Sequence, residues 1–164
     1  MTIKEKINQE FKEAFKAKKE LEVSVLRMLN SNIKNKEFEK RAKLSKSGAP
    51  EAELEKQSRL TDEEVLGVIG MEAKRRKDSI AQYQNGGRPE LAAQEEAELK
   101  ILAVYLPEQM GEEEIRKIVQ ESIKEAGAAS AQDMGKVMNV LMPKVKGRAD
   151  GGLVNRLVKE ELGG

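Results

Sequence analysis

The sequence contains no cysteine and no histidine among its 164 residues. Without cysteine there can be no disulfide bond, thiolate nucleophile or thiolate metal site, and a reducing compartment fits this composition. Without histidine, Ser-His-Asp and Cys-His catalytic sites and most zinc or iron sites are excluded. These two absences rule out many enzyme classes, and we expect no catalytic residues, no cofactor and no metal.

Aromatic residues are also scarce, at 3% of the chain, whereas charged residues make up 36% and the net charge is only +1. This composition suits surface-rich helices and not strand-rich sandwiches or barrels. No apolar run approaches the 18 to 20 residues that a membrane span requires. The sequence therefore predicts an all-α protein that is cytoplasmic and has no membrane partner.

Apolar residues recur at three- and four-residue steps along the first two thirds of the chain, as on one face of a helix. Capping boxes, in which a Thr is followed three residues later by a Glu, begin the first helix at Thr2 and a later one at Thr61. The segment 45–59 lacks apolar periodicity and is interpreted as a flexible connection with room for a short helical turn. The expected helices cover residues 2–18, 21–44, 61–85 and 89–106, and Phe38 falls on the apolar stripe of the second.

A boundary is predicted at residues 107–111, where a proline and a glycine interrupt the helical pattern. Beyond it, periodic segments predict a helix ending at Gly127, a second from Ser130 to Pro143 and a third capped by Asp150 or a neighbouring glycine. The fold class is thus all-α, with an N-terminal helical module of about four helices over residues 1–106. A small three-helix module is expected over residues 107–164.

The most informative stretch combines glycines with basic residues in the C-terminal module. Between Met134 and Lys159 there are six Lys and Arg residues but a single acid, Asp150, so the local charge is +5. Such a loop beside a helix start offers backbone N–H groups and cations to phosphate oxygens. The alternative is that the glycines only permit turns and the lysines are solvated. The candidate nucleic-acid-binding residues are Lys136, Lys144, Lys146, Gly147, Arg148, Asn155 and Arg156.

Other charged clusters have simpler interpretations. The four side chains from Lys74 to Lys77 point in different directions around a helix, which indicates a solvated face. The cations between Lys34 and Lys43 lie near the C-terminal end of a helix, where they favourably oppose the negative end of its dipole. The few aromatic residues fall mostly on helix faces, which predicts no stacking platform for single-stranded bases and favours duplex or folded RNA. Carboxylates at exposed helix starts give no support to an acid-base site.

Several short motifs together resemble the GatB/YqeY family over essentially the whole chain. They are Ser24-Val25-Leu26-Arg27-Met28-Leu29, Lys36-Glu37-Phe38-Glu39-Lys40-Arg41, Lys77-Asp78-Ser79, Gly87-Arg88, Tyr105-Leu106-Pro107, Asp133-Met134-Gly135-Lys136-Val137-Met138, Lys146-Gly147-Arg148-Ala149-Asp150-Gly151 and Val154-Asn155. The C-terminal module is similar to the tail domain of the B subunit of aspartyl/glutamyl-tRNA amidotransferase. That resemblance implies contact with tRNA, or with a tRNA-enzyme complex, by the motif between Gly135 and Asn155.

Three functions remain open at this point. The first is non-catalytic binding of tRNA through phosphate contacts, and the second is a helical protein-interaction module without RNA binding. The third, implied by the resemblance alone, is a component of a carbon-nitrogen ligase with glutamine as amido-N-donor. That component would act only with added amidotransferase subunits, because this chain has neither the amidase nucleophile nor a phosphoryl-transfer site.

Overall fold

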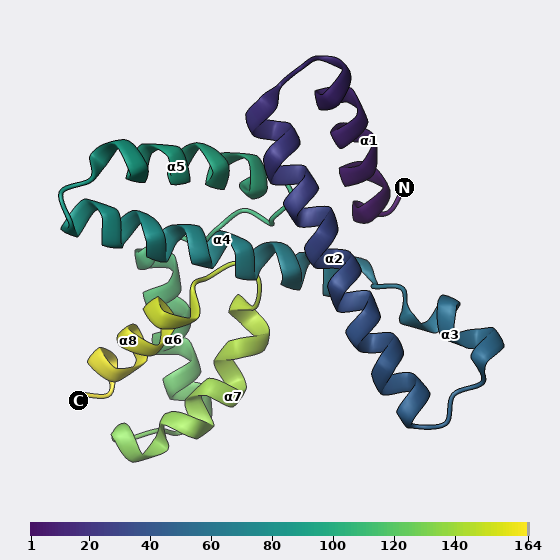
Figure 1. Cartoon of the computed structure of the whole chain (residues 1–164). Coiled ribbons are helices and arrows are strands. Elements are labelled where there is room, and N and C mark those ends of the chain that lie inside the picture. The colour runs from purple at the N-terminus through teal and green to yellow at the C-terminus, as the bar shows by residue number, and fades with distance from the viewer. Residues whose placement is uncertain (164) are drawn as a thin grey trace. The chain divides into compact units, whose positions relative to one another are not determined.

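The computed structural model describes residues 1–163 and is all-α over that range, as the composition and periodicity predicted. The chain divides into two compact units, Met1–Tyr105 and the residues from Leu106 onward. Each unit has a core of its own, and Figure 1 shows the helices of both. We describe the units separately.

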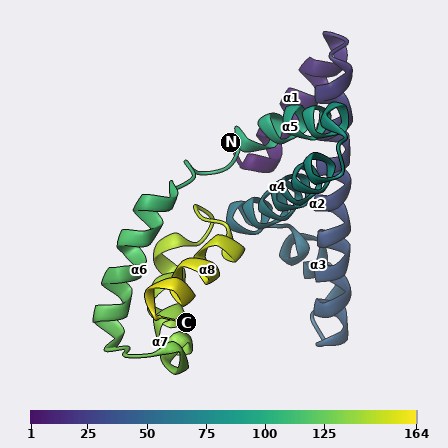
Figure 2. The same ribbon diagram turned by 90° about the vertical axis from the view of Figure 1, so that its left-hand side faces the viewer.

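The N-terminal unit has five helices, where about four were expected. They are α1 (Ile3–Lys16), α2 (Glu20–Lys46), α3 (Glu51–Ser58), α4 (Asp62–Asn85) and α5 (Pro89–Ala103). The helices α1 and α2 form one antiparallel hairpin and α4 and α5 form another, while α3 folds back beside the end of α2 (Figure 1). All four other helices of the unit contact α2, and Figure 2 shows α1, α4 and α5 on the same side of it.

Both predicted capping boxes are confirmed. The Thr2 hydroxyl accepts a hydrogen bond from the Glu5 amide at 3.2 Å, and the Glu5 carboxylate accepts one from the Thr2 amide at 2.8 Å. Thr61 and Glu64 repeat the arrangement at the start of α4, at 3.2 and 2.8 Å. These bonds satisfy amide groups that have no partner within the helix, so both helices begin where the sequence predicted.

Within the connection predicted over residues 45–59, the short helical turn that the sequence allowed is present as a longer helix. Helix α2 continues to Lys46, and Glu51–Ser58 forms the eight-residue helix α3. A helix this short is marginal on its own, and it is held by tertiary contacts. Leu54 is buried where α3 packs on α2, and the amide of Leu60 donates to the Glu37 carboxylate at 3.2 Å.

Two side chains of the N-terminal unit lie where the sequence did not place them. Phe38 was assigned to the apolar stripe of the second helix, but its side chain is 65% exposed. Arg76 was assigned to a solvated face, but it is 8% exposed and pairs with Glu72 and Glu98 at 3.1 Å each. Glu72 is buried as well, so the expectation that the carboxylates lie on exposed positions fails there.

The C-terminal unit contains α6 (Glu112–Ala126), α7 (Met134–Val145) and α8 (Gly151–Glu161), with a 3-10 turn before α7. Helix α6 ends at Gly127, whose φ of 64° is the left-handed conformation that glycine adopts without strain. Helix α7 does not close at Pro143 as predicted. Pro143 removes only one hydrogen bond near the helix end, and the last turn persists because Val145 is buried in the core.

The core of this unit is a small apolar cluster shared by its three helices. The buried members are Met110, Ile115, Val119, Val137, Leu141, Val145, Val154, Leu157 and Val158. Met134 and Met138 pack against this cluster, as expected of methionines that fill a core. Because the buried positions of α7 and α8 recur every three or four residues, the polar residues between them lie on the outer faces of both helices.

Candidate nucleic-acid interface

Lys136 lies in the first turn of α7 and is largely exposed. Its ammonium is 3.7 Å from Asp133 Oδ1, and its side chain is 73% exposed. The Ala129 amide donates to Asp133 Oδ2 at 2.9 Å, and this bond, with the nearby Lys136 charge, holds the pKa of the carboxyl below its ordinary value. The ion pair between Lys136 and Asp133 is therefore loose, although the backbone holds the Asp133 carboxylate in place.

Lys144 and Lys146 come from the end of α7. The Lys144 ammonium lies 2.6 Å from Glu125 Oε2, in the last turn of α6. Lys146 is the C-cap residue of α7, with its amide bonded to the Met142 carbonyl at 2.9 Å. Both cations are on the surface, and the carboxylate partner of Lys144 belongs to another helix.

Gly147 and Arg148 form a bend that is tied to the segment preceding α6. Gly147 has a φ of 76°, a conformation that favours glycine, and its carbonyl accepts from the Gln109 side chain at 3.0 Å. The Arg148 carbonyl accepts from the Met110 amide at 2.8 Å, and its guanidinium lies 3.9 Å from Glu114. The bend is therefore a fixed part of the fold as well as a basic segment.

Asn155 and Arg156 lie on the exposed face of α8. The Arg156 guanidinium is 3.2 Å from Glu112 Oε2 and 3.9 Å from Glu160 Oε1, whereas Asn155 faces away from the buried Val154 and Leu157 positions. The helix begins at Asp150, whose side chain accepts from the Leu153 amide at 3.1 Å. Of the two caps that the sequence allowed, the structure has Asp150.

The Asp150 cap supports a prediction about stability. Replacing Asp150 by Ala leaves the Leu153 amide without its partner, and we expect the free energy of unfolding to fall by about 1 kcal/mol. Urea denaturation followed by circular dichroism measures this. Asp150→Asn is the matched control, because Asn caps helices as well as Asp does; an equal loss in both variants would mean that the charge, and not the cap, is responsible.

The predicted residues do not converge on one point. Lys144 pairs with the last turn of α6, while Arg148 and Arg156 pair with Glu114 and Glu112 in its first turn. A helix of 15 residues is about 22 Å long. The cations thus follow the length of a helix, an arrangement that suits an extended polyanion better than a single small anion.

The sequence analysis missed the acidic partners of these cations. The residues from Leu106 onward contain nine Lys and Arg against ten Asp and Glu, so the excess of +5 between Met134 and Lys159 is balanced within the unit. Arg116 pairs with two carboxylates of α8 at once, at 2.8 Å from Glu161 and 2.9 Å from Glu160. The Arg116 guanidinium holds the pKa of Glu161 below its ordinary value. The acidic first turn of α6 was visible in the sequence, but its proximity to the basic loop was not.

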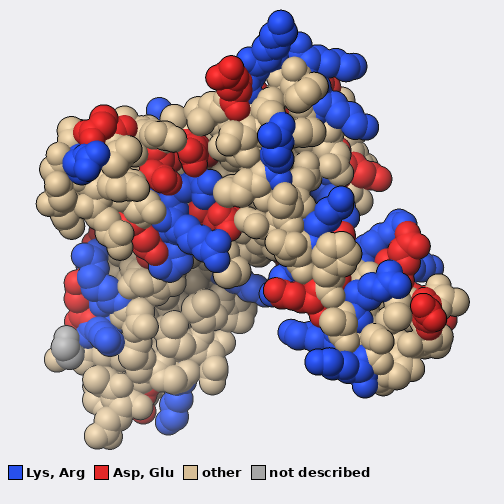
Figure 3. Space-filling model, viewed as in Figure 1, with Lys and Arg blue, Asp and Glu red and all other residues tan. Residues whose placement is uncertain are grey.

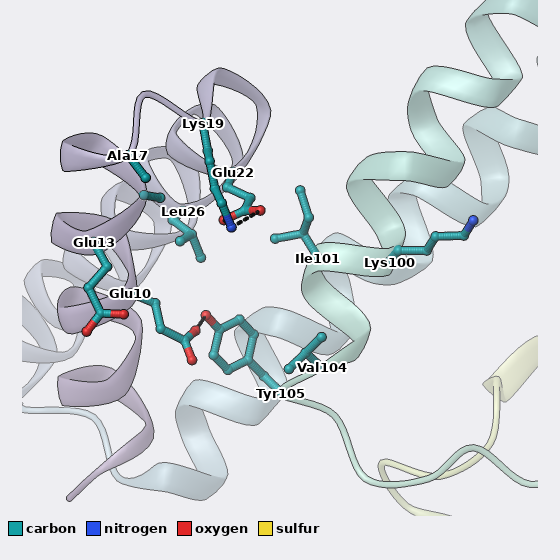
Figure 4. Close-up of a pocket in the computed structure, with 11 residues that line it drawn as sticks. Glu10, Glu13, Ala17, Lys19, Glu22, Leu26, Lys100, Ile101, Val104 and Tyr105 are labelled. Atoms are coloured by element: carbon teal, nitrogen blue, oxygen red, sulfur yellow. Dashed lines mark hydrogen bonds and ion pairs between the residues drawn. The ribbon is translucent and has the colours of Figure 1, made fainter.

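The N-terminal unit contains an open hollow of about 450 Å³ between α1, the start of α2 and the end of α5 (Figure 4). Tyr105 lies on its wall with its hydroxyl hydrogen-bonded to Glu10, and burial with this bond raises the pKa of Tyr105 well above its ordinary value. Burial and the bond to Glu10 therefore both favour the neutral form of this tyrosine. Lys19 lines the same hollow, and its ammonium forms an ion pair with Glu22 Oε1 at 3.1 Å.

Two features are absent from residues 1–163. No three Asp or Glu side chains in that range are placed to share a metal ion. None of the helices in the same range is long and apolar enough for a bilayer crossing.

Comparison with known proteins gives matches over most of the chain. The family described as Yqey-like protein matches residues 4–51 and 43–162. A protein of Vanderwaltozyma polyspora called Altered inheritance of mitochondria protein 41, mitochondrial, is 30% identical over 100 residues, which are 61% of this chain and 46% of that protein. The protein of the same name from Pyrenophora tritici-repentis is 33% identical over 108 residues, 63% of this chain and 58% of its own length. The chain spans about half the length of these curated relatives.

Proposed function

This chain belongs to the Yqey-like protein family, and from that membership we propose that it is a non-catalytic protein that binds tRNA, or a tRNA-enzyme complex, through its C-terminal unit. The proposed contact surface consists of Lys136, Lys144, Lys146, Gly147, Arg148, Asn155 and Arg156 on α7, α8 and the bend between them. We propose a cytoplasmic location. The curated relatives are named as mitochondrial proteins. The cytoplasm and the mitochondrion both contain tRNA, so the proposed ligand is present in either compartment.

One observation carries the proposal: the cations of α7 and α8 are held at the surface by carboxylates that a polyanion can replace. The side chains of Lys144 and Glu125 are 36% and 60% exposed, and those of Arg156 and Glu112 are both more than half exposed. Exposed ion pairs of this kind contribute about 0 to 1 kcal/mol each. A phosphate backbone that displaces its counterions therefore competes successfully for the cations, while the pairs keep the free side chains extended along the surface.

The second candidate is binding of a protein partner, such as an amidotransferase subunit, by the same unit. It is favoured by the slight acidic excess of the residues from Leu106 onward, which opposes a polyanion at long range. The two candidates differ in how binding depends on salt. Phosphate contacts release counterions as they form, whereas apolar docking of helices does not.

We expect the affinity for tRNA to decrease steeply with salt. Five cationic contacts predict a slope of about −3.5 to −4.5 in a plot of log K against log salt concentration. Affinity should therefore fall by roughly 100- to 500-fold between 50 and 200 mM salt. Fluorescence anisotropy of labelled tRNA titrated with the full chain measures this. A slope shallower than about −1, or no binding at 50 mM salt, would contradict the proposal.

A further inference from the structure

The C-terminal half of α2 carries the largest concentration of positive charge in the N-terminal unit. Residues 34–46 include two acids, Glu37 and Glu39, against six cations. These cations are Lys34, Lys36, Lys40, Arg41, Lys43 and Lys46. Lys and Arg side chains gather in Figure 3 where the end of α2 lies beside α3. We call residues 34–46 the α2 basic segment.

Most of this charge is not neutralised within the molecule. Glu37 is taken by Lys4 at 2.6 Å, and Glu39 is paired with Lys36 at 3.0 Å. Among residues 1–163, no ion pair is formed by four cations of the segment, which are Lys34, Arg41, Lys43 and Lys46. In the C-terminal unit, by contrast, Lys144 and Arg156 each have a carboxylate partner. The α2 basic segment is therefore the less compensated of the two surfaces.

Phe38 projects from the middle of this segment. A single exposed apolar residue is ordinary and indicates nothing alone. Phe38, however, shares its helix face with Lys34 and Arg41, which stand four residues before it and three after it. Two open hollows of about 480 Å³ each are lined by both Phe38 and Arg41. One of the hollows is also lined by Lys4 and Arg59, which are paired there with Glu37 and Glu55.

An exposed aromatic ring among unpaired cations has the composition that binds single-stranded nucleic acid. The cations track the phosphate backbone, and bases stack on the aromatic face, with an arginine available for additional stacking. The segment from Lys34 to Lys46 is about 18 Å long, which allows contacts with several successive nucleotides. The carboxylates of an acidic peptide would match the charge, but Asp and Glu side chains have no aromatic face to stack on the ring of Phe38.

We propose that the α2 basic segment binds an unpaired stretch of RNA, with one base stacked on Phe38 and neighbouring phosphates on Lys34 and Arg41. This inference rests on the proposed function in taking RNA as the ligand, but it places a second contact in the other unit and gives it a different target, unpaired bases. It departs from the expectation that the chain has no stacking platform, and the two are distinguished by whether a base stacks on Phe38.

The test uses the full chain and a single-stranded RNA oligonucleotide that carries one 2-aminopurine, whose fluorescence responds to stacking. We expect a fluorescence change on binding, its loss in Phe38→Ala, and about a 10-fold weaker affinity for the oligonucleotide in that variant. Phe38→Trp should retain the change because it keeps an aromatic face. Val104→Ala is the matched control, because Val104 is also exposed, at 68%, but lines the hollow that contains Glu10 and Glu13.

The outcomes separate this inference from the proposed function. Removing the cations of α7 and α8 should weaken tRNA binding but leave the 2-aminopurine change in place. If Phe38→Ala leaves the change and the affinity intact while tRNA binding remains salt-dependent, the α2 inference is overturned and the proposed function stands. Binding of polyglutamate at the α2 basic segment, with no fluorescence change from the oligonucleotide, would also overturn it in favour of an acidic protein partner.

Discussion

Replacing Arg76 by Ala should lower the free energy of unfolding of the N-terminal unit by about 3 kcal/mol or more. Arg76 extends from α4 and pairs with Glu72 at 3.1 Å on its own helix and with Glu98 at 3.1 Å on α5. Its guanidinium also lies 3.2 Å from the sulfur of Met28 on α2. The substitution leaves Glu98 without the guanidinium that compensates it and leaves the buried Glu72 with only the exposed Arg75, and it opens a gap among three helices.

Arg75 provides the matched control for this prediction. It pairs with the same carboxylate, Glu72, at 2.8 Å, but its side chain is 68% exposed. Removing an exposed partner changes stability by about 1 kcal/mol or less. Urea denaturation followed by circular dichroism compares the two variants, and hydrogen exchange of the α4 amides locates the loss. Similar losses for Arg75→Ala and Arg76→Ala would show that burial of Arg76 does not matter.

A rescue variant tests the physical cause. Buried charge networks are often no better for stability than apolar residues of similar volume, whereas half of a network is costly. The combination of Arg76→Met, Glu72→Met and Glu98→Met should therefore recover much of the stability lost in Arg76→Ala. Failure of the rescue would mean that the geometry of the network, including the bond to Met28, specifies how α4, α5 and α2 pack.

The parts of the fold that the sequence predicted well are those fixed within a few residues. The capping boxes at Thr2 and Thr61 and the left-handed Gly127 depend on local hydrogen bonds and backbone conformation. These features are short-range, so their residues alone define where a helix begins or ends. Helix α3 was expected only as a short turn because it has a single buried apolar residue, Leu54, and its stability comes from packing on α2.

The errors that matter for function share a different cause. Periodicity indicates which residues can be buried, but not whether another helix covers them. Phe38 continues the apolar pattern of α2, yet it is exposed. Arg76 looked solvated because its decisive partner, Glu98, lies 22 residues further along the chain on another helix. Similarly, the excess of basic residues near Gly147 could be counted in the sequence, but their pairing with the two ends of α6 depends on tertiary structure.

The cations that pair with α6 should dominate the affinity for tRNA. Replacing Lys144, Arg148 and Arg156 together by Gln should reduce affinity for tRNA by about 100-fold at 50 mM salt, since each lost charged contact contributes on the order of 1 kcal/mol. The salt slope should become shallower by about 2 to 3 units. Because the three side chains are outside the buried core, the helical circular dichroism should be unchanged.

Breaking the same three ion pairs from their acidic side gives the decisive comparison. Glu112, Glu114 and Glu125 hold the three cations in the free protein, so their joint replacement by Gln removes competitors of the phosphate backbone. We therefore expect tighter tRNA binding in this acidic-side variant and weaker binding in the basic-side variant, measured by the same anisotropy titration. If both variants bind less tightly, the ion pairs act only by maintaining the fold, and the cations of α7 and α8 do not contact RNA.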